Sequence, residues 1–145
     1  MRDVRRSALL PYAPEQVYGL VADVERYPEF LPWCTAARIL AQDGDEVTVT
    51  LGLASGLARA KFTTRNRLEP GRALTMSLVE GPFDHLEGRW QFTPISNCGT
   101  RADLHVAFAT HGLLGAIALG PAFESACNHL VDAFARRARQ VFGGR

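Results

Sequence analysis

The sequence lacks the residue patterns by which many enzymes and metalloproteins are recognised. Its three cysteines, Cys34, Cys98 and Cys127, lie far apart, without a Cys-x-x-Cys pair or the Cys/His spacing of a zinc site. It also has no Gly-x-Ser-x-Gly elbow, no His-Glu-x-x-His pair and no glycine loop for phosphate. We therefore expect a protein that is not an enzyme, with no catalytic residue, no metal site and no required cofactor.

Repeats, low-complexity tracts and long hydrophobic runs are missing as well. The longest weakly polar run, residues 112–123, is too short to cross a bilayer and contains Gly120-Pro121. The odd number of cysteines and the absence of a secretory leader suggest the reducing cytosol. With 145 residues and no linker, we expect a single domain over residues 1–145. The net charge of +1 neither favours nor excludes nucleic acid as a partner.

The spacing of the apolar residues changes twice along the chain. Arg5–Leu10 is predicted to be a strand, and a short helix runs from Pro14 to about Val24. Five segments then alternate apolar and polar residues, which is typical of antiparallel strands with one dry face. They are Glu46–Leu53, Ala58–Thr63, Leu74–Leu78, Leu86–Phe92 and Asp103–Phe108. Gly, Pro and Asn turn signals separate them, the last at Ser96–Gly99.

The last third of the chain returns to a helical spacing. Apolar residues recur at three- and four-residue steps between Gly120-Pro121 and Gly143-Gly144, and Val141 is the last of them. A curved sheet with one dry face needs a cover, and only this helix is long enough. We predict an α+β fold of the helix-grip type, with short helices after the first strand. A gap between such a sheet and one helix is a natural outcome.

Four stretches, in this order, carry a resemblance to a known family. They are LPYAPEQVYGLVADVERYPEFLPWC (residues 10–34), FTTRN (62–66), GPFDHLEGRWQF (81–92), and LGPAF with VDAFARRARQVFG (119–143). The chain resembles the coenzyme Q-binding and ribosome-association-toxin family of the START-like polyketide cyclase/dehydrase superfamily (START/Bet v 1-like). The resemblance implies the same helix-grip fold and a long apolar cavity under the C-terminal helix.

The family resemblance implies two different functions. One is non-catalytic binding of ubiquinone or another lipid in support of respiration. The other is binding of the large ribosomal subunit, which blocks subunit association. The sequence motifs leave both open, and a cyclase-like enzyme is a third alternative. We expect a cytoplasmic protein, with a monomer favoured and peripheral contact with the inner membrane left open.

The predicted cavity is lined by inward-facing residues of the strands and the last helix. A close-packed core is the alternative, because protein interiors are normally filled. A dry apolar space suits a quinone ring or an isoprenoid tail, and a methionine adapts its shape to either. The candidate ligand-binding residues are Phe30, Trp33, Phe62, Met76, Leu78, Phe83, Trp90, Phe108, Phe123 and Cys127.

The segment VERYPEFLPWC (residues 24–34) is apolar, although its prolines oppose a regular helix or a central strand. By resemblance, it lies where a helix-grip cavity opens. We expect Tyr27 and Glu29 to face water, while Phe30, Leu31 and Trp33 turn inward. The segment would then form a rigid lip at the mouth of the cavity.

Polar candidates are few. Asp84, His85 and Glu87 are close enough in sequence for an acid/base cluster, but solvated loop charges are the commoner outcome. Phe83 sits at the tip of the Gly81-Pro82 turn, as a hairpin plug or as a ligand contact. A cyclase would need a polar group deep in the cavity, for which the candidates are Thr64, Asn66, Ser77 and Arg89.

Four cations alternate along one predicted strand, with Thr63 between them. Such residues share the outward face of a strand at intervals of about 6–7 Å. They are Arg59, Lys61, Arg65 and Arg67, called the basic ridge below. No acid is expected on that side of the strand, so the ridge suits ribosomal RNA phosphates or anionic lipid head groups. A solvated outer face is the alternative, and the helix residues Arg136, Arg137 and Arg139 would add to the ridge if they lie on the same side.

Overall fold

The computed structural model describes residues 1–96 and 99–143. A strand, a helix and a short 3-10 helix come first, six strands follow, and three helical segments end the chain. Their bounds are β1 Arg2–Leu10, α1 Pro14–Ala22, η1 Val24–Glu29, β2 Cys34–Asp43, β3 Glu46–Ser55, β4 Ala58–Glu69, β5 Ala73–Glu80, β6 Phe83–Ile95, β7 Gly99–Thr110, α2 Gly112–Leu114, η2 Gly115–Leu119 and α3 Gly120–Phe142. Residues 97 and 98 of the predicted Ser96–Gly99 turn, including Cys98, and Gly144 of the predicted helix end lie outside the described residues.

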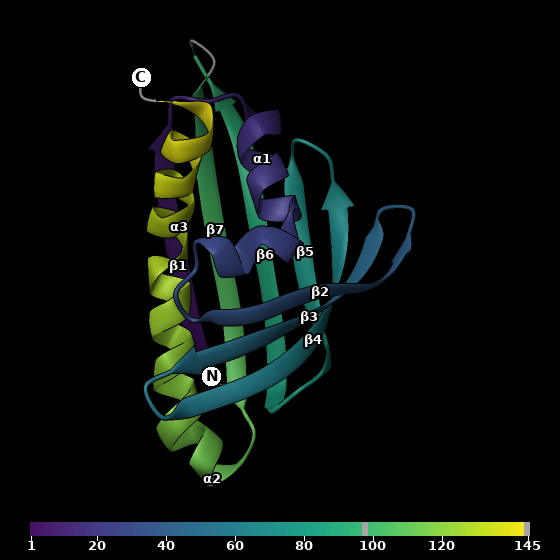
Figure 1. The fold of residues 1–145 in the computed structure, drawn as a ribbon, viewed down its shortest axis with the longest axis vertical. Coiled ribbons are helices and arrows are strands. Elements are labelled where there is room, and N and C mark those ends of the chain that lie inside the picture. The colour runs from purple at the N-terminus through teal and green to yellow at the C-terminus, as the bar shows by residue number, and fades with distance from the viewer. Residues whose placement is uncertain (97–98, 144–145) are drawn as a thin grey trace.

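The seven strands form one antiparallel sheet in the order β1-β7-β6-β5-β4-β3-β2. Each strand from β2 to β7 pairs with its neighbour in the chain, whereas β1 pairs with β7 and sets Arg2 opposite Phe108. In Figure 1 the sheet bends so strongly that β2, β3 and β4 run across the direction of β6 and β7. The predicted α+β helix-grip fold is confirmed: a curved antiparallel sheet wraps a long C-terminal helix, and short helices follow the first strand.

Helix α3 runs along β1 and β7 on the concave side of the sheet (Figure 1). Its buried residues recur at the spacing of one helix face. They include Phe123, Ala126, Cys127, Val131, Phe134 and Ala138. The predicted stripe is wrong at Val141, which is 51% exposed. In the last turn Phe142 faces the core instead, with its ring centre 5.4 Å from that of Tyr12.

The proline-containing segment after α1 folds as the 3-10 helix η1, with Pro28 inside it. A 3-10 helix has three residues per turn, so Val24, Tyr27 and Phe30 fall on one face. That face turns toward the core, and Tyr27 is buried with its hydroxyl donating to the Val21 carbonyl. The expectation that Tyr27 faces water is therefore wrong. The expectations for its neighbours hold: Leu31 is buried and Glu29 is exposed.

Strand β2 is absent from the predicted elements. Register shifts between Cys34 and Ala36, and again between Ile39 and Ala41, break its alternation. As an edge strand, β2 pairs only with β3, and most of its residues are at least partly exposed. A strand with neither regular alternation nor a dry face leaves no period-two pattern in the sequence.

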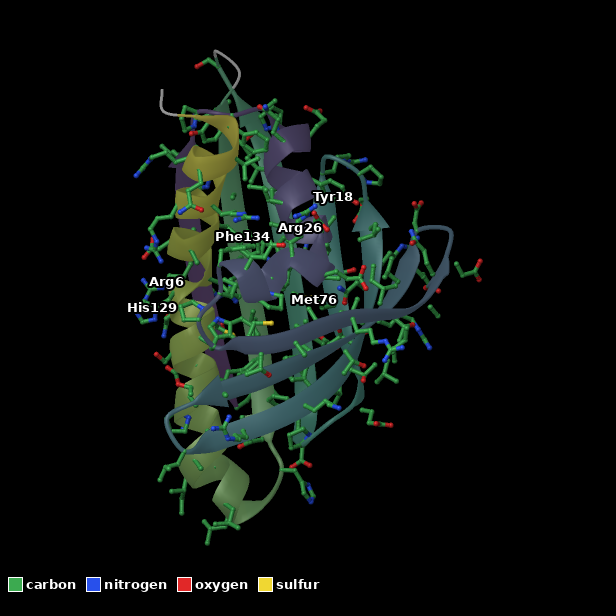
Figure 2. All side chains as sticks on the ribbon, viewed as in Figure 1. Arg6, Tyr18, Arg26, Met76, His129 and Phe134 are labelled. Carbon is green, nitrogen blue, oxygen red and sulfur yellow. The ribbon has the colours of Figure 1, made fainter. Side chains whose placement is uncertain are left out.

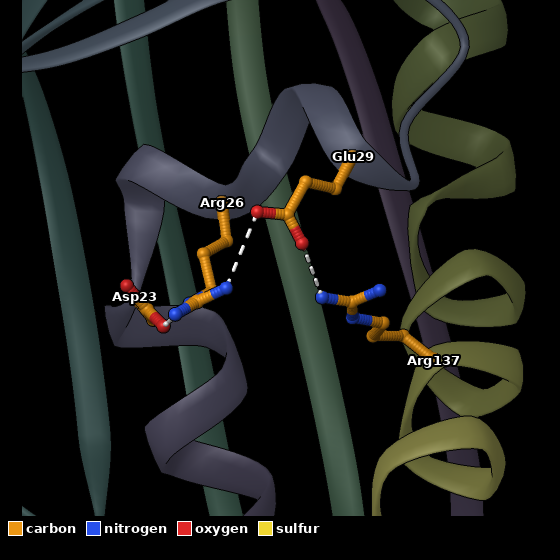
Figure 3. Close-up of polar contacts among 4 residues, drawn as sticks. All are labelled: Asp23, Arg26, Glu29 and Arg137. Carbon is orange, nitrogen blue, oxygen red and sulfur yellow. Dashed lines mark hydrogen bonds and ion pairs between the residues drawn. The ribbon is translucent and has the colours of Figure 1, made fainter.

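A chain of ion pairs fastens η1 to α3 (Figure 3). Arg26 lies 3.1 Å from Asp23 and 3.3 Å from Glu29. Arg137 of α3 donates to the other carboxylate oxygen of Glu29 at 2.7 Å. The Arg137 guanidinium also lies over the Phe30 ring, 5.0 Å from its centre. The Arg137 side chain is only 18% exposed, so its charge is the least screened by water and salt among these four ion-paired residues.

Replacing Arg137 by alanine removes both the hydrogen bond to Glu29 and the cation–π contact with Phe30. We expect the free energy of unfolding to fall by about 1 kcal/mol in urea titrations. Arg136→Ala is the matched control, since Arg136 is exposed and forms no ion pair among the described residues. An equal loss in the two variants would contradict the coupling of η1 to α3.

Candidate functional site

A cavity of about 60 Å³ lies between the concave face of the sheet, η1 and α3. Met76 of β5 and Phe134 of α3, both labelled in Figure 2, line it from the sheet and from the helix. Six of the ten predicted ligand-binding residues line this cavity. They are Trp33, Phe62, Met76, Trp90, Phe123 and Cys127.

The other four predicted residues lie beside the cavity rather than in its lining. Phe83 and Phe108 pack against Phe123, with ring centres 5.0 and 4.7 Å from it, and so form a plug under one end. Phe83 begins β6 and is buried outside the lining, a position that agrees with the hairpin plug rather than with a ligand contact. Phe30 makes an edge-to-face contact with Phe134, with ring centres 5.1 Å apart, and Leu78 is half-buried against the core.

Two polar side chains, Thr64 and Asn66, lie in the otherwise largely apolar lining. Both come from β4 and are only 4% exposed. The Thr64 hydroxyl donates a hydrogen bond of 2.8 Å to Oδ1 of Asn66. Their spacing of two residues places them on the same face of the strand, and that spacing is the signal by which the sequence points to them.

The room for Met76 comes from Gly88, which lies directly opposite on β6. A Cβ on Gly88 would lie 2.6 Å from Cε of Met76, so the methionine tip occupies the space that a side chain would fill. Methionine has three rotatable bonds and adapts to irregular space. The shape of the cavity therefore depends on a flexible side chain above a glycine.

Two thiols are buried, that of Cys127 in the cavity lining and that of Cys34 at the start of β2. Cys127 is 3% exposed, and burial, followed by the charge of Glu124, raises its pKa to about 12. Burial also raises the pKa of the Cys34 thiol to about 11 and that of the Tyr27 hydroxyl above its ordinary range. These groups therefore stay neutral at physiological pH. An apolar lining with neutral groups suits an uncharged ligand.

The predicted acid/base cluster lies away from the cavity. His111 pairs with Asp84 at 2.7 Å, and the partly exposed His85 lies 3.9 Å from the exposed Glu87. Of the cyclase candidates, Ser77 and Arg89 are on the opposite face of the sheet from Thr64 and Asn66. Within residues 1–96 and 99–143, no three His, Cys, Asp or Glu side chains are grouped as a metal site would require.

The basic ridge, Arg59, Lys61, Arg65 and Arg67, lies on the convex face of β4, and all four side chains are exposed. Thr63 faces the same way and shares a hydrogen bond of 2.8 Å with Thr50. On the neighbouring strand β3, Glu46 lies opposite Arg67. Even so, no ridge cation has a carboxylate partner within 4.0 Å in the part of the chain that the structure describes. The arginines of α3 lie on the concave side and do not extend the ridge.

The family model for "Polyketide cyclase / dehydrase and lipid transport" matches residues 10–135. The chain belongs to this family. It is 44% identical to the ribosome association toxin RatA of Pseudomonas aeruginosa over 140 residues, with 97% of each chain covered. It is 26% identical to the mitochondrial coenzyme Q-binding protein COQ10 homolog B of Xenopus laevis, covering 94% of this chain and 58% of that relative.

Solved structures with the same fold include an enzyme. The ZhuI aromatase/cyclase from a Streptomyces species superposes with a TM-score of 0.84 at 21% identity, covering 97% of this chain and 95% of that one. The 18 kDa protein CC1736 of Caulobacter crescentus is 34% identical, with a TM-score of 0.74 and coverage of 99% and 100%. No helix in the described residues has the length and apolar character to cross a membrane.

The raised pKa of Cys127 makes stability depend on pH in one direction. In the unfolded chain the thiol ionises near its ordinary value of 9.0, whereas in the folded protein it ionises near 12. The stabilisation is therefore complete below pH 9 and is lost as the pH rises toward 12. At pH 10.5 we expect a loss of about 2 kcal/mol from this group in urea titrations.

Between pH 7 and pH 10.5, the free energy of unfolding of Cys127→Ala should fall by about 2 kcal/mol less than that of the wild type, whatever the effect of the substitution at pH 7. For each protein, the measurement is the difference between the free energies of unfolding at pH 7 and at pH 10.5. A wild-type protein and a Cys127→Ala variant with the same pH dependence would contradict the burial of a protonated thiol.

Proposed function

We propose that this protein binds a hydrophobic small molecule of the quinone or lipid class in the cavity between the sheet and α3, without catalysis. The observation that carries the proposal is a largely apolar, aromatic-rich lining in which Thr64, Asn66 and the hydroxyl of Tyr27 are the polar groups among the described residues. Ligand sites of this kind combine an apolar wall with a few placed polar groups. The COQ10 relative, named for binding coenzyme Q, supports ubiquinone as the ligand. On this proposal the bound quinone serves respiration.

The cavity has to open for such a ligand. Its volume of about 60 Å³ is well below the roughly 300–1,000 Å³ of pockets that hold drug-sized molecules. The movable parts are the tip of Met76 and the η1 segment, which is tied to α3 through the ion pair of Arg137 with the half-exposed Glu29. Ligand entry on this proposal displaces Met76 and lifts η1 away from α3.

The chemistry of the lining favours binding over a cyclase reaction. Among the described residues, the lining contains no carboxylate, histidine, lysine or arginine. Its titratable groups, Tyr27 and Cys127, both have raised pKa values and stay protonated. General acid–base catalysis needs a group whose pKa lies near the working pH. The ligand is thus cargo, and the proposal requires no cofactor.

Ubiquinone binding should quench the intrinsic fluorescence of the protein. Trp33 and Trp90 are the two tryptophans of the chain, and both line the cavity. Titration with ubiquinone-1 is expected to give saturable quenching. Ala126→Leu, which fills the cavity from α3, should weaken this binding by about tenfold or more.

Ala135→Leu on the same helix is the control, since Ala135 is half-buried outside the lining. Organic extraction of the protein purified from its own host should yield a quinone or lipid. Quenching that is linear in quinone concentration, together with an extract free of apolar ligand, would remove the proposal.

A second candidate function is association with the large ribosomal subunit. The 44% identical relative is named as a ribosome association toxin, and the basic ridge offers exposed cations for RNA phosphates. This surface lies on the convex face of the sheet, away from the cavity. The two functions therefore use different faces and do not compete for residues.

Charge-reversal variants test whether ribosome binding depends on the basic ridge in particular or only on the net charge of the protein. Arg65→Glu with Arg67→Glu should reduce co-sedimentation with large ribosomal subunits by tenfold or more at low salt, roughly as expected for the loss of two phosphate contacts. Arg136→Glu with Arg139→Glu changes the net charge equally on the exposed side of α3. If both double variants co-sediment as the wild type does, the ridge is not a ribosome-binding surface.

A further inference from the structure

Asn66 lies deep on the concave face of the sheet, within the cavity lining. Its pairing partners across the ladder are Val47 on β3 and Met76 on β5. With only 4% of its surface exposed, it is among the few buried polar side chains of the described residues. An amide in an apolar setting costs free energy unless its groups are hydrogen-bonded.

The hydrogen bond from Thr64 fixes which end of the amide is free. The Thr64 hydroxyl donates to Oδ1 of Asn66, so the carbonyl end is occupied. The Nδ2 amino group has no hydrogen-bond partner among the described residues. Yet no fully enclosed side-chain nitrogen or oxygen in these residues lacks a partner. Nδ2 therefore keeps contact with open space, and the open space beside Asn66 is the cavity.

An amide NH₂ is a donor only. A bound molecule that meets it with hydrocarbon leaves the donor unpaired, at a cost in affinity, whereas a carbonyl oxygen satisfies it. We propose that Asn66, held by Thr64, is the polar anchor of the cavity and selects ligands that present a carbonyl oxygen. This inference rests on the proposed binding function and adds the chemical class of the ligand: a quinone, ketone or ester, rather than a plain hydrocarbon.

The neighbours of Asn66 leave room for a ring beside the anchor. Met76 lies directly across from it, and Gly88 continues the same row on β6. The Met76 tip rests where a Gly88 side chain would be. When the tip turns away, the vacated space over Gly88 lies two strands from Asn66, about 10 Å across the sheet. A planar ring that reaches from this space across the row of Met76 toward Asn66 brings a ring carbonyl to the donor.

Duroquinone and durene test the selection, because both are planar rings with four methyl groups, and two carbonyl groups of duroquinone stand where durene has two aromatic C–H groups. Binding to the full chain is followed by ¹H–¹⁵N NMR of the Trp33 and Trp90 indoles, which line the cavity, and of the Asn66 side-chain NH₂. We expect duroquinone to bind about tenfold more tightly than durene. It should also move the Asn66 NH₂ protons downfield, as a new hydrogen bond does.

Three variants carry the test further. Asn66→Leu should weaken duroquinone binding by about tenfold and leave durene binding unchanged. Thr64→Val, which frees the amide to rotate, should weaken duroquinone by a smaller factor. The matched control is Thr63→Val, since the Thr63 hydroxyl faces the convex side and bonds Thr50. The NMR shift of Asn66 is read in the wild type and decides the question even if Asn66→Leu does not fold.

The outcomes separate this inference from the proposed function. Equal affinity for duroquinone and durene, or an Asn66 NH₂ signal that does not move on saturation, overturns the anchor while leaving the apolar binding function intact. If neither compound binds, both the anchor and the proposed function fall. A carbonyl preference that Asn66→Leu abolishes and Thr63→Val retains supports the anchor.

Discussion

The apolar stripe of α3 has one place to be buried, and the curved sheet provides it. Phe123, Cys127 and Phe134 need an apolar partner surface, and only the concave face of a strongly bent sheet surrounds a single helix on more than one side. A roughly cylindrical helix does not fill the space inside such a bent sheet completely. Aromatic rings close one end, and η1 covers the other part with Tyr27 and Phe30. What remains is the cavity, so the site follows from how the core is closed.

Strand β4 serves both faces of the molecule. Its even-numbered residues near the centre, Thr64 and Asn66, face the cavity, whereas Arg65 and Arg67 face the solvent on the convex side. A strand displays alternate residues on opposite faces, so a polar anchor and a basic surface fit into four consecutive positions. The names of the relatives point in two directions, to ribosomes and to coenzyme Q. The geometry accommodates both without conflict, because a ligand inside the sheet leaves the ridge uncovered.

Much of this architecture was predictable from the sequence, because alternation and helical spacing report which residues face the core. The same patterns do not report depth. Phe83 and Phe108 face inward as predicted but lie under Phe123 rather than in the lining. The sequence patterns also mispredict which residues face the core where the local period is unusual. Tyr27 follows the three-residue turn of η1, and the bulges of β2 remove the alternation of that strand. The orientation of the Asn66 amide depends on the hydrogen bond from Thr64, which a residue pattern alone does not reveal.

The pairing of β1 with β7 has a consequence for how the molecule is made. Strand β1 is synthesised before the other strands of the sheet, yet its ladder partner is β7, which is synthesised after them. Until β7 is present, β1 has no neighbour, and until α3 follows, the whole concave face is open to water. Sheets closed by contacts so distant in sequence fold slowly and expose apolar surface meanwhile. A nascent chain of this protein therefore acquires its fold only after β7 and α3 have been synthesised, and shortened chains that stop before α3 are expected to aggregate.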